Sequence, residues 1–399
     1  MGKRVGQIKS GEQLAKLGKD ALDSIKTEKV EGAEPASHTG PHSKDQPEQA
    51  KLDQRPPMQS SPSVKQSDSK SRAEELEKSL VTSWRELVGG YFRRFKPEYF
   101  SVSAGGQGRR LGQDDGRARQ PQRASSPKDD GNCIGMETVL SYAFLKADYD
   151  FVSAQAVKQD EDAVLADLPL NNGDVLGRPS EKPIGGPKRF KGGSTCSIAL
   201  ISTPTPMPFW HPASPSTLIV SHVGDTRILL CNTATGLAIP MTTNHHPSDP
   251  GEATRLRRYA ATFVTDSFGE ERVSGLANTR AFGDMQSKRI GVSAEPEIRR
   301  LELAPAEYSF IVLMSDGVSG MLSDQEIVDI VKEARTPEQG ARDVVSFATE
   351  IAADADNATA LVVRLGGWER RGEGGLGSLG TKEMRDFKRE DAMNPRRRQ

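Results

Sequence analysis

Three aspartates stand where strands would end or begin, which is where proteins hold metal-binding carboxylates rigidly. Asp316 follows the apolar run Phe310–Met314, and Asp356 directly precedes the last apolar run of the chain. If these runs form antiparallel neighbouring strands, the exit of one lies beside the entrance of the other. Both carboxylates then project from one sheet edge. Asp225, in a Gly-Asp turn between two apolar runs, is a third candidate for that edge.

Carboxylates held close together repel one another unless a cation lies between them. A set of ligands made only of oxygen atoms favours Mg²⁺ or Mn²⁺ over zinc. The alternative for each aspartate, taken singly, is an ordinary turn residue whose side chain bonds to its own backbone. The sequence therefore predicts either a divalent-cation site at Asp225, Asp316 and Asp356 or three unrelated turn residues.

Other arrangements with catalytic potential are weak or missing. The chain has three cysteines, Cys133, Cys196 and Cys231. They have neither metal-ligand spacing nor an even-numbered disulfide framework, which indicates a reducing, intracellular setting. No Cys-x5-Arg phosphate loop occurs.

Composition limits the class of protein. Only 35% of the 399 residues are apolar, below the roughly 45–50% usual for globular chains, so part of the chain is expected not to fold. The formal charge of −1 gives no reason to expect nucleic acid as a partner. No run of 18 apolar residues occurs, so no membrane span is expected.

Composition also divides the chain into five segments. Residues 1–71 are expected to be a disordered or targeting segment, whose Lys-rich start leaves cytoplasm and mitochondrion both open. Residues 72–98 have apolar residues at helical spacing, which predicts an amphipathic helix packing on the core, with a protein-binding helix as the alternative. A mobile insertion is expected at 99–131, a folded domain at 132–366 and a disordered basic tail at 367–399.

Within the folded domain, strands are expected in hairpins and helices apart from them, which favours an α+β fold. The turn Gly224-Asp225 predicts a tight hairpin between the apolar runs on either side. Helix starts are marked by Asp249-Pro250, by a Ser323/Glu326 capping box and by Thr336-Pro337.

The motifs also follow a distinctive order. They are Gly193-Ser194-Thr195, Gly224-Asp225-Thr226-Arg227, Asn244-His245-His246-Pro247, Leu276-Ala277-Asn278-Thr279-Arg280-Ala281-Phe282-Gly283-Asp284, Glu295-Pro296, Ser315-Asp316-Gly317 and Asp356-Asn357. In type, order and spacing this series resembles the PPM (PP2C-like) family of metal-dependent serine/threonine protein phosphatases. The resemblance covers roughly residues 192–365.

The resemblance implies a four-layer αββα sandwich, two antiparallel sheets flanked by helices. It implies a monomeric phosphatase that hydrolyses phosphoserine and phosphothreonine in proteins by a water activated at two Mg²⁺ or Mn²⁺ ions. Asp316 and Asp356 would ligate the first ion, and Asp225 with Asp316 would lie at a third, weaker position. The implied residues of the cleft or flap are Gly317, Asn357, Arg280 and Asp284. The resemblance also implies that the pair His245-His246, in front of Pro247, is a surface turn element, so it receives no role.

The front part of the family's site is missing from the sequence. No Asp-Gly-His-Gly-Gly motif occurs, so no residue receives the role of bridging metal ligand, proton donor or phosphate-binding arginine. The sandwich is accordingly expected to be incomplete at its N-terminal strands and to expose strand edges. Three explanations stay open: an incomplete sequence of an active enzyme, an inactive pseudophosphatase that binds proteins, or missing strands supplied from elsewhere.

Overall fold

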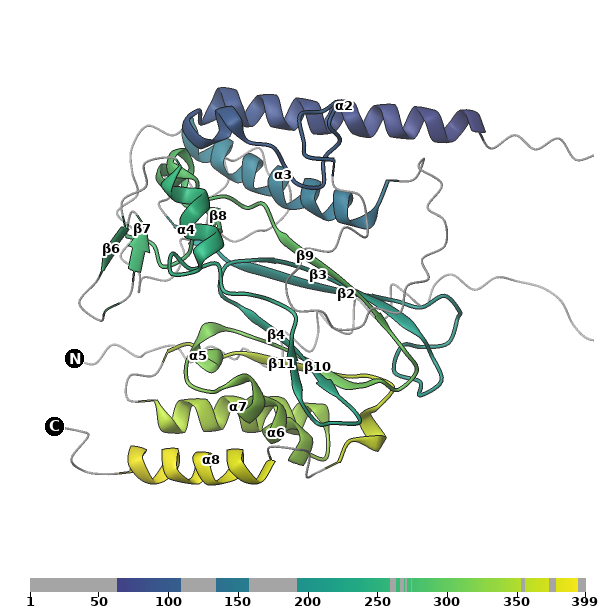
Figure 1. Ribbon diagram of the computed structural model, residues 1–399, viewed down its shortest axis with the longest axis vertical. Coiled ribbons are helices and arrows are strands. Elements are labelled where there is room, and N and C mark those ends of the chain that lie inside the picture. The colour runs from purple at the N-terminus through teal and green to yellow at the C-terminus, as the bar shows by residue number, and fades with distance from the viewer. Residues whose placement is uncertain are drawn as a thin grey trace, which may run out of the picture. The chain divides into compact units, whose positions relative to one another are not determined.

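The computed structural model describes residues 63–108, 134–157, 192–258, 263–265, 269, 271–273, 275–352, 356–372 and 378–393. The disorder expected for residues 1–62 and the mobility expected for 109–131 concern residues outside these ranges. Two antiparallel sheets form the centre of the described fold (Figure 1). No helix of the described ranges is both long and apolar enough to cross a bilayer.

The first sheet has three strands in the order β2-β3-β9. Their bounds are β2 Cys196–Ser202, β3 Ser216–Val223 and β9 Glu297–Leu303. The second sheet has four strands in the order β11-β10-β4-β5. Their bounds are β4 Arg227–Asn232, β5 Ala238–Pro240, β10 Tyr308–Met314 and β11 Ala360–Arg364.

Two small ribbons accompany the sheets. One pairs β1 Gly193–Ser194 with β8 Phe282–Gly283, and the other pairs β6 Phe263–Thr265 with β7 Glu271–Val273.

The two sheets pack face to face through alternate residues of their strands. Leu218 and Val220 of β3 contact Ile228 and Leu230 of β4 and Ile311 of β10 in one buried cluster. Because side chains alternate across a strand, the residues between them face the outer layers. Burying this apolar area is the main force that holds the sheets together.

Helices cover the outer face of each sheet, as Figure 1 shows. On the three-stranded sheet lie α3, and beyond it α2. On the four-stranded sheet lie α6 and α7, with α8 outside them. The helices are α2 Ser63–Leu87, α3 Met136–Ala156, α4 Pro250–Arg257, α5 Asp316–Ser319, α6 Asp324–Glu333, α7 Pro337–Ile351 and α8 Ser378–Ala392, with 3₁₀ turns η1 Gly90–Arg94, η2 Met285–Ile290 and η3 Trp368–Arg370. The expected αββα layering is confirmed.

The expected amphipathic helix does pack on the core, but it ends earlier than the pattern predicted. Trp84 is fully buried, stacks on Phe92 at 4.3 Å between ring centroids, and donates a hydrogen bond from Nε1 to the Leu145 carbonyl oxygen of α3. Gly89 and Gly90 have positive φ angles, which stop α2 and lead into η1. The apolar spacing continues through η1, so periodicity alone could not locate the break.

Three expectations of disorder or mobility are wrong for the residues described. The helix α2 begins at Ser63, inside the segment 1–71 that was expected to be disordered. In the segment 99–131, Phe100 and Ala104 are buried, and the Ser101 amide donates to the buried Glu77 carboxylate at 2.8 Å. In the tail 367–399, residues 378–392 form α8, held to α6 and α7 by side-chain ion pairs. Low apolar content suggested disorder there, and charge complementarity supplies the attachment instead.

The tight hairpin expected at Gly224-Asp225 is also wrong. β3 and β4, on either side of this turn, belong to different sheets. Their apolar faces stack across the sandwich, whereas their edges pair with other strands. Two apolar runs joined by a short turn can pair or stack, and the turn residues do not distinguish the two. The turn therefore links the sheets.

Candidate metal-binding edge

The strand register brings Asp225, Asp316 and Asp356 to one end of the four-stranded sheet. Met314 of β10 lies opposite Ala360 of β11 on one side and Arg227 of β4 on the other. Asp316 follows β10 by two residues, while Asp225 and Asp356 precede β4 and β11. We call these three residues the carboxylate edge. The sequence placed Asp316 and Asp356 there on the assumption of antiparallel pairing between β10 and β11, and that pairing is confirmed. Asp225 was expected there at the tip of a hairpin, which is wrong, and it comes instead from the turn that links the two sheets.

Short-range backbone contacts fix the β10 and β11 ends of this edge. The Ser315 amide donates to the Thr359 carbonyl oxygen at 3.0 Å, and Ser315 Oγ accepts from the Thr359 amide at 3.0 Å. Gly317 lies so close to Asn357 that an added Cβ would stand 2.6 Å from its carbonyl oxygen. Gly317 and Asn357, two expected cleft residues, therefore hold the loops together through their backbones.

The electrostatics of the edge are those of crowded carboxylates. Partial burial, Asp225 and Asp356 together raise the pKa of Asp316, while its bond from the Gly317 amide lowers it in part. The Asp225 carboxylate accepts a hydrogen bond from Asn278 Nδ2 at 2.9 Å. A cation would relieve the mutual repulsion, and the oxygen-only donors suit Mg²⁺ or Mn²⁺.

The donor chemistry of the edge fits such an ion, but the set is incomplete. Within the part of the chain that the structure describes, no three acidic, histidine or cysteine side chains converge closely enough to hold a metal. The metal role of Asp225, Asp316 and Asp356 accordingly stays a prediction.

Arg280, expected beside the cleft, belongs to a charged network centred on Glu252. Its guanidinium donates through Nε and Nη2 to Glu252 at 3.1 and 2.7 Å, and through Nη1 to the Glu295 carbonyl oxygen at 2.9 Å. Arg255 donates to the same Glu252 carboxylate at 2.7 Å, and Thr279 Oγ1 does so at 2.6 Å. These bonds hold the segment after Asn278 against α4.

Asp284, the second expected flap residue, starts η2 in the left-handed region with φ 46°. Burial raises the pKa of Asp284 to about 6, and Lys288 opposes that rise in part. Lys288 itself is fully buried and forms a 2.6 Å ion pair with Asp148 of α3, which also accepts from the Gly283 amide at 2.8 Å. This pair ties the flap segment to α3.

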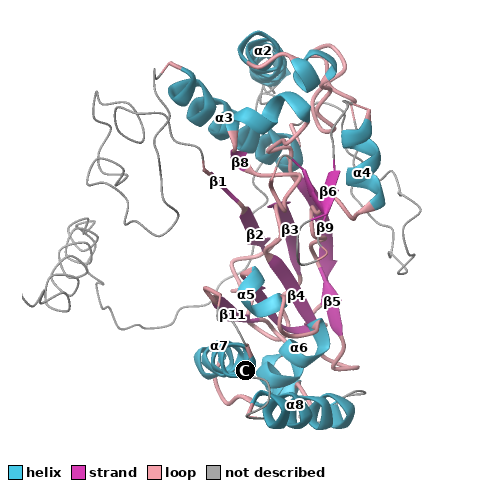
Figure 2. Ribbon diagram, turned by 90° about the vertical axis from the view of Figure 1, so that its left-hand side faces the viewer, coloured by secondary structure: helices cyan, strands magenta, loops and turns pink. Residues whose placement is uncertain are grey.

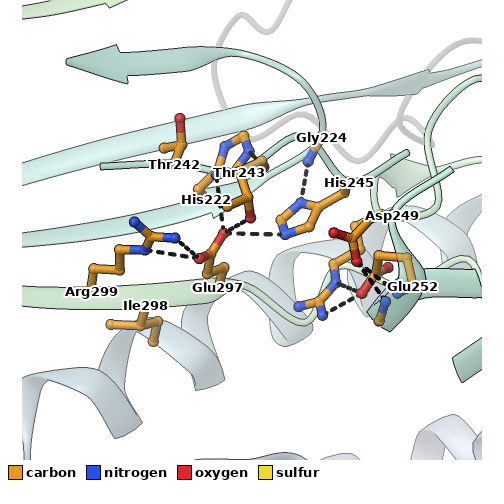
Figure 3. Close-up of polar contacts among 12 residues, drawn as sticks. His222, Gly224, Thr242, Thr243, His245, Asp249, Glu252, Glu297, Ile298 and Arg299 are labelled. Atoms are coloured by element: carbon orange, nitrogen blue, oxygen red, sulfur yellow. Dashed lines mark hydrogen bonds and ion pairs between the residues drawn. The ribbon is translucent and has the colours of Figure 1, made fainter. Parts of the chain in front are cut away.

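Two buried histidines, His222 of β3 and His245, lie beneath the turn that carries Asp225. His245 is only 3% exposed, so its interpretation as a surface turn element is wrong. Its ring stacks on the buried His222 with 4.8 Å between centroids, and its Nε2 lies 3.6 Å from Glu297 Oε2 (Figure 3). Burial lowers the pKa of His222 to about 4 and that of His245 to about 2, so both rings are neutral at physiological pH. A lone His inside the apolar run of β3 was the available signal.

Comparison with known proteins finds matches described as protein phosphatases, both in a family model and among individual relatives. A family model described as Protein phosphatase 2C matches residues 136–357. Protein phosphatase 2C homolog 4 of Schizosaccharomyces pombe is 38% identical over 234 residues, which cover 58% of this chain and 53% of that protein. Protein phosphatase 1K, mitochondrial, of Xenopus laevis is 36% identical over 152 residues, covering 38% and 40%. The chain thus spans about half the length of these relatives or less.

Solved structures with a similar arrangement include a C. elegans sex determining protein, with a TM-score of 0.35 and 23% identity over 40% of this chain and 42% of that one. Another is a serine-threonine phosphatase 2C from Toxoplasma gondii, with a TM-score of 0.34 and 23% identity over 39% and 59%.

Proposed function

Because the chain belongs to the protein phosphatase 2C family, we propose that it hydrolyses phosphoserine and phosphothreonine in proteins with divalent cations at the carboxylate edge. The observation that carries the proposal is the position of Asp225, Asp316 and Asp356 at one end of the four-stranded sheet, near enough for Asp225 and Asp356 to raise the pKa of Asp316. When bound, Mg²⁺ or Mn²⁺ would act as a Lewis acid that offsets charge on the phosphoryl oxygens.

The chain's own residues would hold and aim the carboxylates. Asp316, at the start of α5, and Asp356, before β11, come from segments joined by the contacts of Ser315 and Gly317, which would keep the two carboxylates near one another. Asp225 comes from the turn between the sheets and is held by Asn278. Arg280 and Asp284 would place the flap segment beside the edge through their contacts with α4, Glu295 and the region of Lys288.

A second candidate is a pseudophosphatase that binds proteins without hydrolysing phosphate. Two observations favour it: the sequence has no Asp-Gly-His-Gly-Gly motif, and no three potential ligands converge among the described residues. The two candidates differ in whether the folded chain turns over a phosphopeptide when cations are present.

The test is phosphate release from a phosphothreonine peptide by the full chain, with and without millimolar Mn²⁺. We expect Mn²⁺-dependent release, and a decrease of roughly 100-fold or more in Asp316→Asn, because a Lewis-acid cation contributes several kcal/mol. Asp386→Asn, at an exposed carboxylate of α8, is the matched control and should keep the wild-type rate. A folded wild-type chain that releases no phosphate at any Mn²⁺ concentration would support the pseudophosphatase.

A further inference from the structure

No regular secondary structure fixes the conformation of the turn that carries Asp225. Gly224 has a φ of +105°, which only glycine adopts readily, and an added Cβ would stand 2.2 Å from Thr195 Cγ2. The turn crosses from one sheet to the other, so no strand ladder holds it. A carboxylate on such a turn needs contacts from elsewhere to stay aimed.

His245 supplies contacts on both sides of Gly224. Its backbone amide donates to the Gly224 carbonyl oxygen at 2.9 Å, and its ring Nδ1 accepts from the Gly224 amide at 3.0 Å. Since Nδ1 accepts, the ring proton is on Nε2, the atom that faces Glu297. Figure 3 shows the ring between the Gly224 amide and the Glu297 carboxylate. One buried residue therefore satisfies both polar backbone groups of Gly224.

The same histidine also holds the segment that reaches the carboxylate itself. The His245 carbonyl oxygen accepts from the Thr279 amide at 2.8 Å and from Thr279 Oγ1 at 3.0 Å. The preceding residue, Asn278, donates from Nδ2 to Asp225 Oδ2 at 2.9 Å. His245 thus connects the Asp225 turn with the residue that bonds to the Asp225 side chain.

The orientation of the Asn278 side-chain amide carries a free-energy penalty. Its Oδ1 is buried and has no hydrogen-bond partner among the residues that the structure describes. A buried acceptor without a partner is unfavourable by about 1–3 kcal/mol. Turning the amide around would place Oδ1 against the Asp225 carboxylate, which is repulsive. The bond to Asp225 is a charge-assisted one, and it is the interaction that fixes the amide.

We propose that Asn278 and His245 are positioning residues for Asp225: Asn278 holds the carboxylate, and His245 holds the turn and the Asn278 segment in register. The cation-related part of this inference rests on the proposed function. The positional part does not, since it concerns the order of the Gly224-Asp225 turn itself.

The experiment measures two properties of the full chain. The first is Mn²⁺ affinity, followed by the electron paramagnetic resonance signal of free Mn²⁺. The second is hydrogen exchange at the Gly224 and Asp225 amides without added metal. The variants are Asn278→Ala, His245→Leu and His245→Asn, whose side-chain oxygen can replace Nδ1 as acceptor for the Gly224 amide. His246→Ala is the control, because its ring bonds to Ser248 instead.

We expect Asn278→Ala and His245→Leu to weaken Mn²⁺ binding about tenfold, the loss typical of one hydrogen bond to a charged group. Amide exchange at Gly224 should accelerate in His245→Leu. His245→Asn should restore both properties, and His246→Ala should leave both unchanged. If His245→Leu does not fold, Asn278→Ala and His245→Asn still decide the question.

Two outcomes separate this inference from the proposed function. A wild-type chain that binds no Mn²⁺ would refute the cation site, while exchange at Gly224 and Asp225 would still report on the positioning. Conversely, unchanged Mn²⁺ affinity in a folded Asn278→Ala variant would overturn the positioning role of Asn278. Exchange of the Gly224 amide that is clearly faster in His245→Asn than in the wild type would overturn the role of the His245 side chain.

Discussion

Glu252 and Glu295 lie in one charged network, but their pKa values are shifted in opposite directions. Burial alone would raise the pKa of Glu252, but the guanidinium groups of Arg280 and Arg255 outweigh burial and lower it well below its usual range. Burial also dominates at Glu295 and raises its pKa to about 7, because the same arginines act on it less strongly. Its carboxylate accepts from the Glu98 amide at 2.7 Å.

Glu295→Gln should therefore change how stability depends on pH. Between the ordinary value of 4.5 and about 7 the folded chain binds this proton more tightly than the unfolded chain. The wild type thus loses stability as pH rises through that window. At pH 8 the variant should be more stable by up to ~3 kcal/mol, and the difference should vanish near pH 4.5.

Urea unfolding at pH 5 and pH 8 measures this effect. Glu383→Gln, at an exposed position of α8, is the control and should show no such pH dependence. An equal effect of Glu295→Gln at both pH values would contradict the raised pKa.

At the scale of elements, α8 turns its charged side toward the domain and its apolar residues outward, which is the opposite of an ordinary amphipathic helix. Its inner side forms ion pairs from Arg385 to Glu333, Lys388 to Glu326 and Arg389 to Glu350, at 2.7, 2.8 and 2.9 Å. Its outer side exposes Met384 and Phe387. Charge pairs near the surface are screened by salt, whereas apolar contacts are not.

We expect salt to loosen α8 selectively. Raising NaCl from low concentration to ~1 M should lower the hydrogen-exchange protection of α8 by about tenfold, because three partly exposed pairs together contribute roughly 1–2 kcal/mol. Helix α7, which packs on the sheet through Val344, Phe347 and Ala348, serves as the internal control. Equal loss of protection in both helices would show that salt acts on the whole fold.

The sequence predicted individual strands and helices better than it predicted which of them lie side by side. Apolar runs and caps located strands β3, β4, β10 and β11 and helices α2, α4, α6 and α7, but not β5, β9 or α8. The pairing of β10 with β11 placed Asp316 beside Asp356. The β3–β4 relation was missed, because stacking between sheets depends on residues far away in the chain. His245 and Asn278 were missed for a related reason: their importance comes from contacts with the turn at Gly224, and no local pattern records these.

At the scale of the molecule, the four sheet edges are of two kinds. β9 carries two glutamates and two arginines, and β5 ends at Pro240, features that discourage pairing with another chain. β2 has no charged residue, and β11 has only Arg364. Both lie on the same side of the sandwich (Figure 2). Within the described residues each pairs with one strand only, so this side resembles the exposed edge expected from the missing N-terminal strands.

Leu361 is 55% exposed on β11, opposite Leu313 of β10, and should promote association through that edge. Leu361→Lys is expected to slow aggregation several-fold, because a charge on an edge strand opposes intermolecular pairing. Light scattering on heating measures it. Leu237→Lys, at a similarly exposed leucine in the β4–β5 turn, is the control, and an equal effect of both substitutions would show that charge alone matters.

The pairing of β3 with β9 has a consequence for synthesis of the chain. β3 ends at Val223, but its partner is complete only at Leu303. At the usual rate of ~5–20 residues per second, the ribosome needs roughly 4–16 s to deliver those ~80 residues. During that interval the β2–β3 hairpin has emerged and one side of β3 is still unoccupied. A chaperone that protects nascent strands would therefore have an opportunity of several seconds to bind at this point.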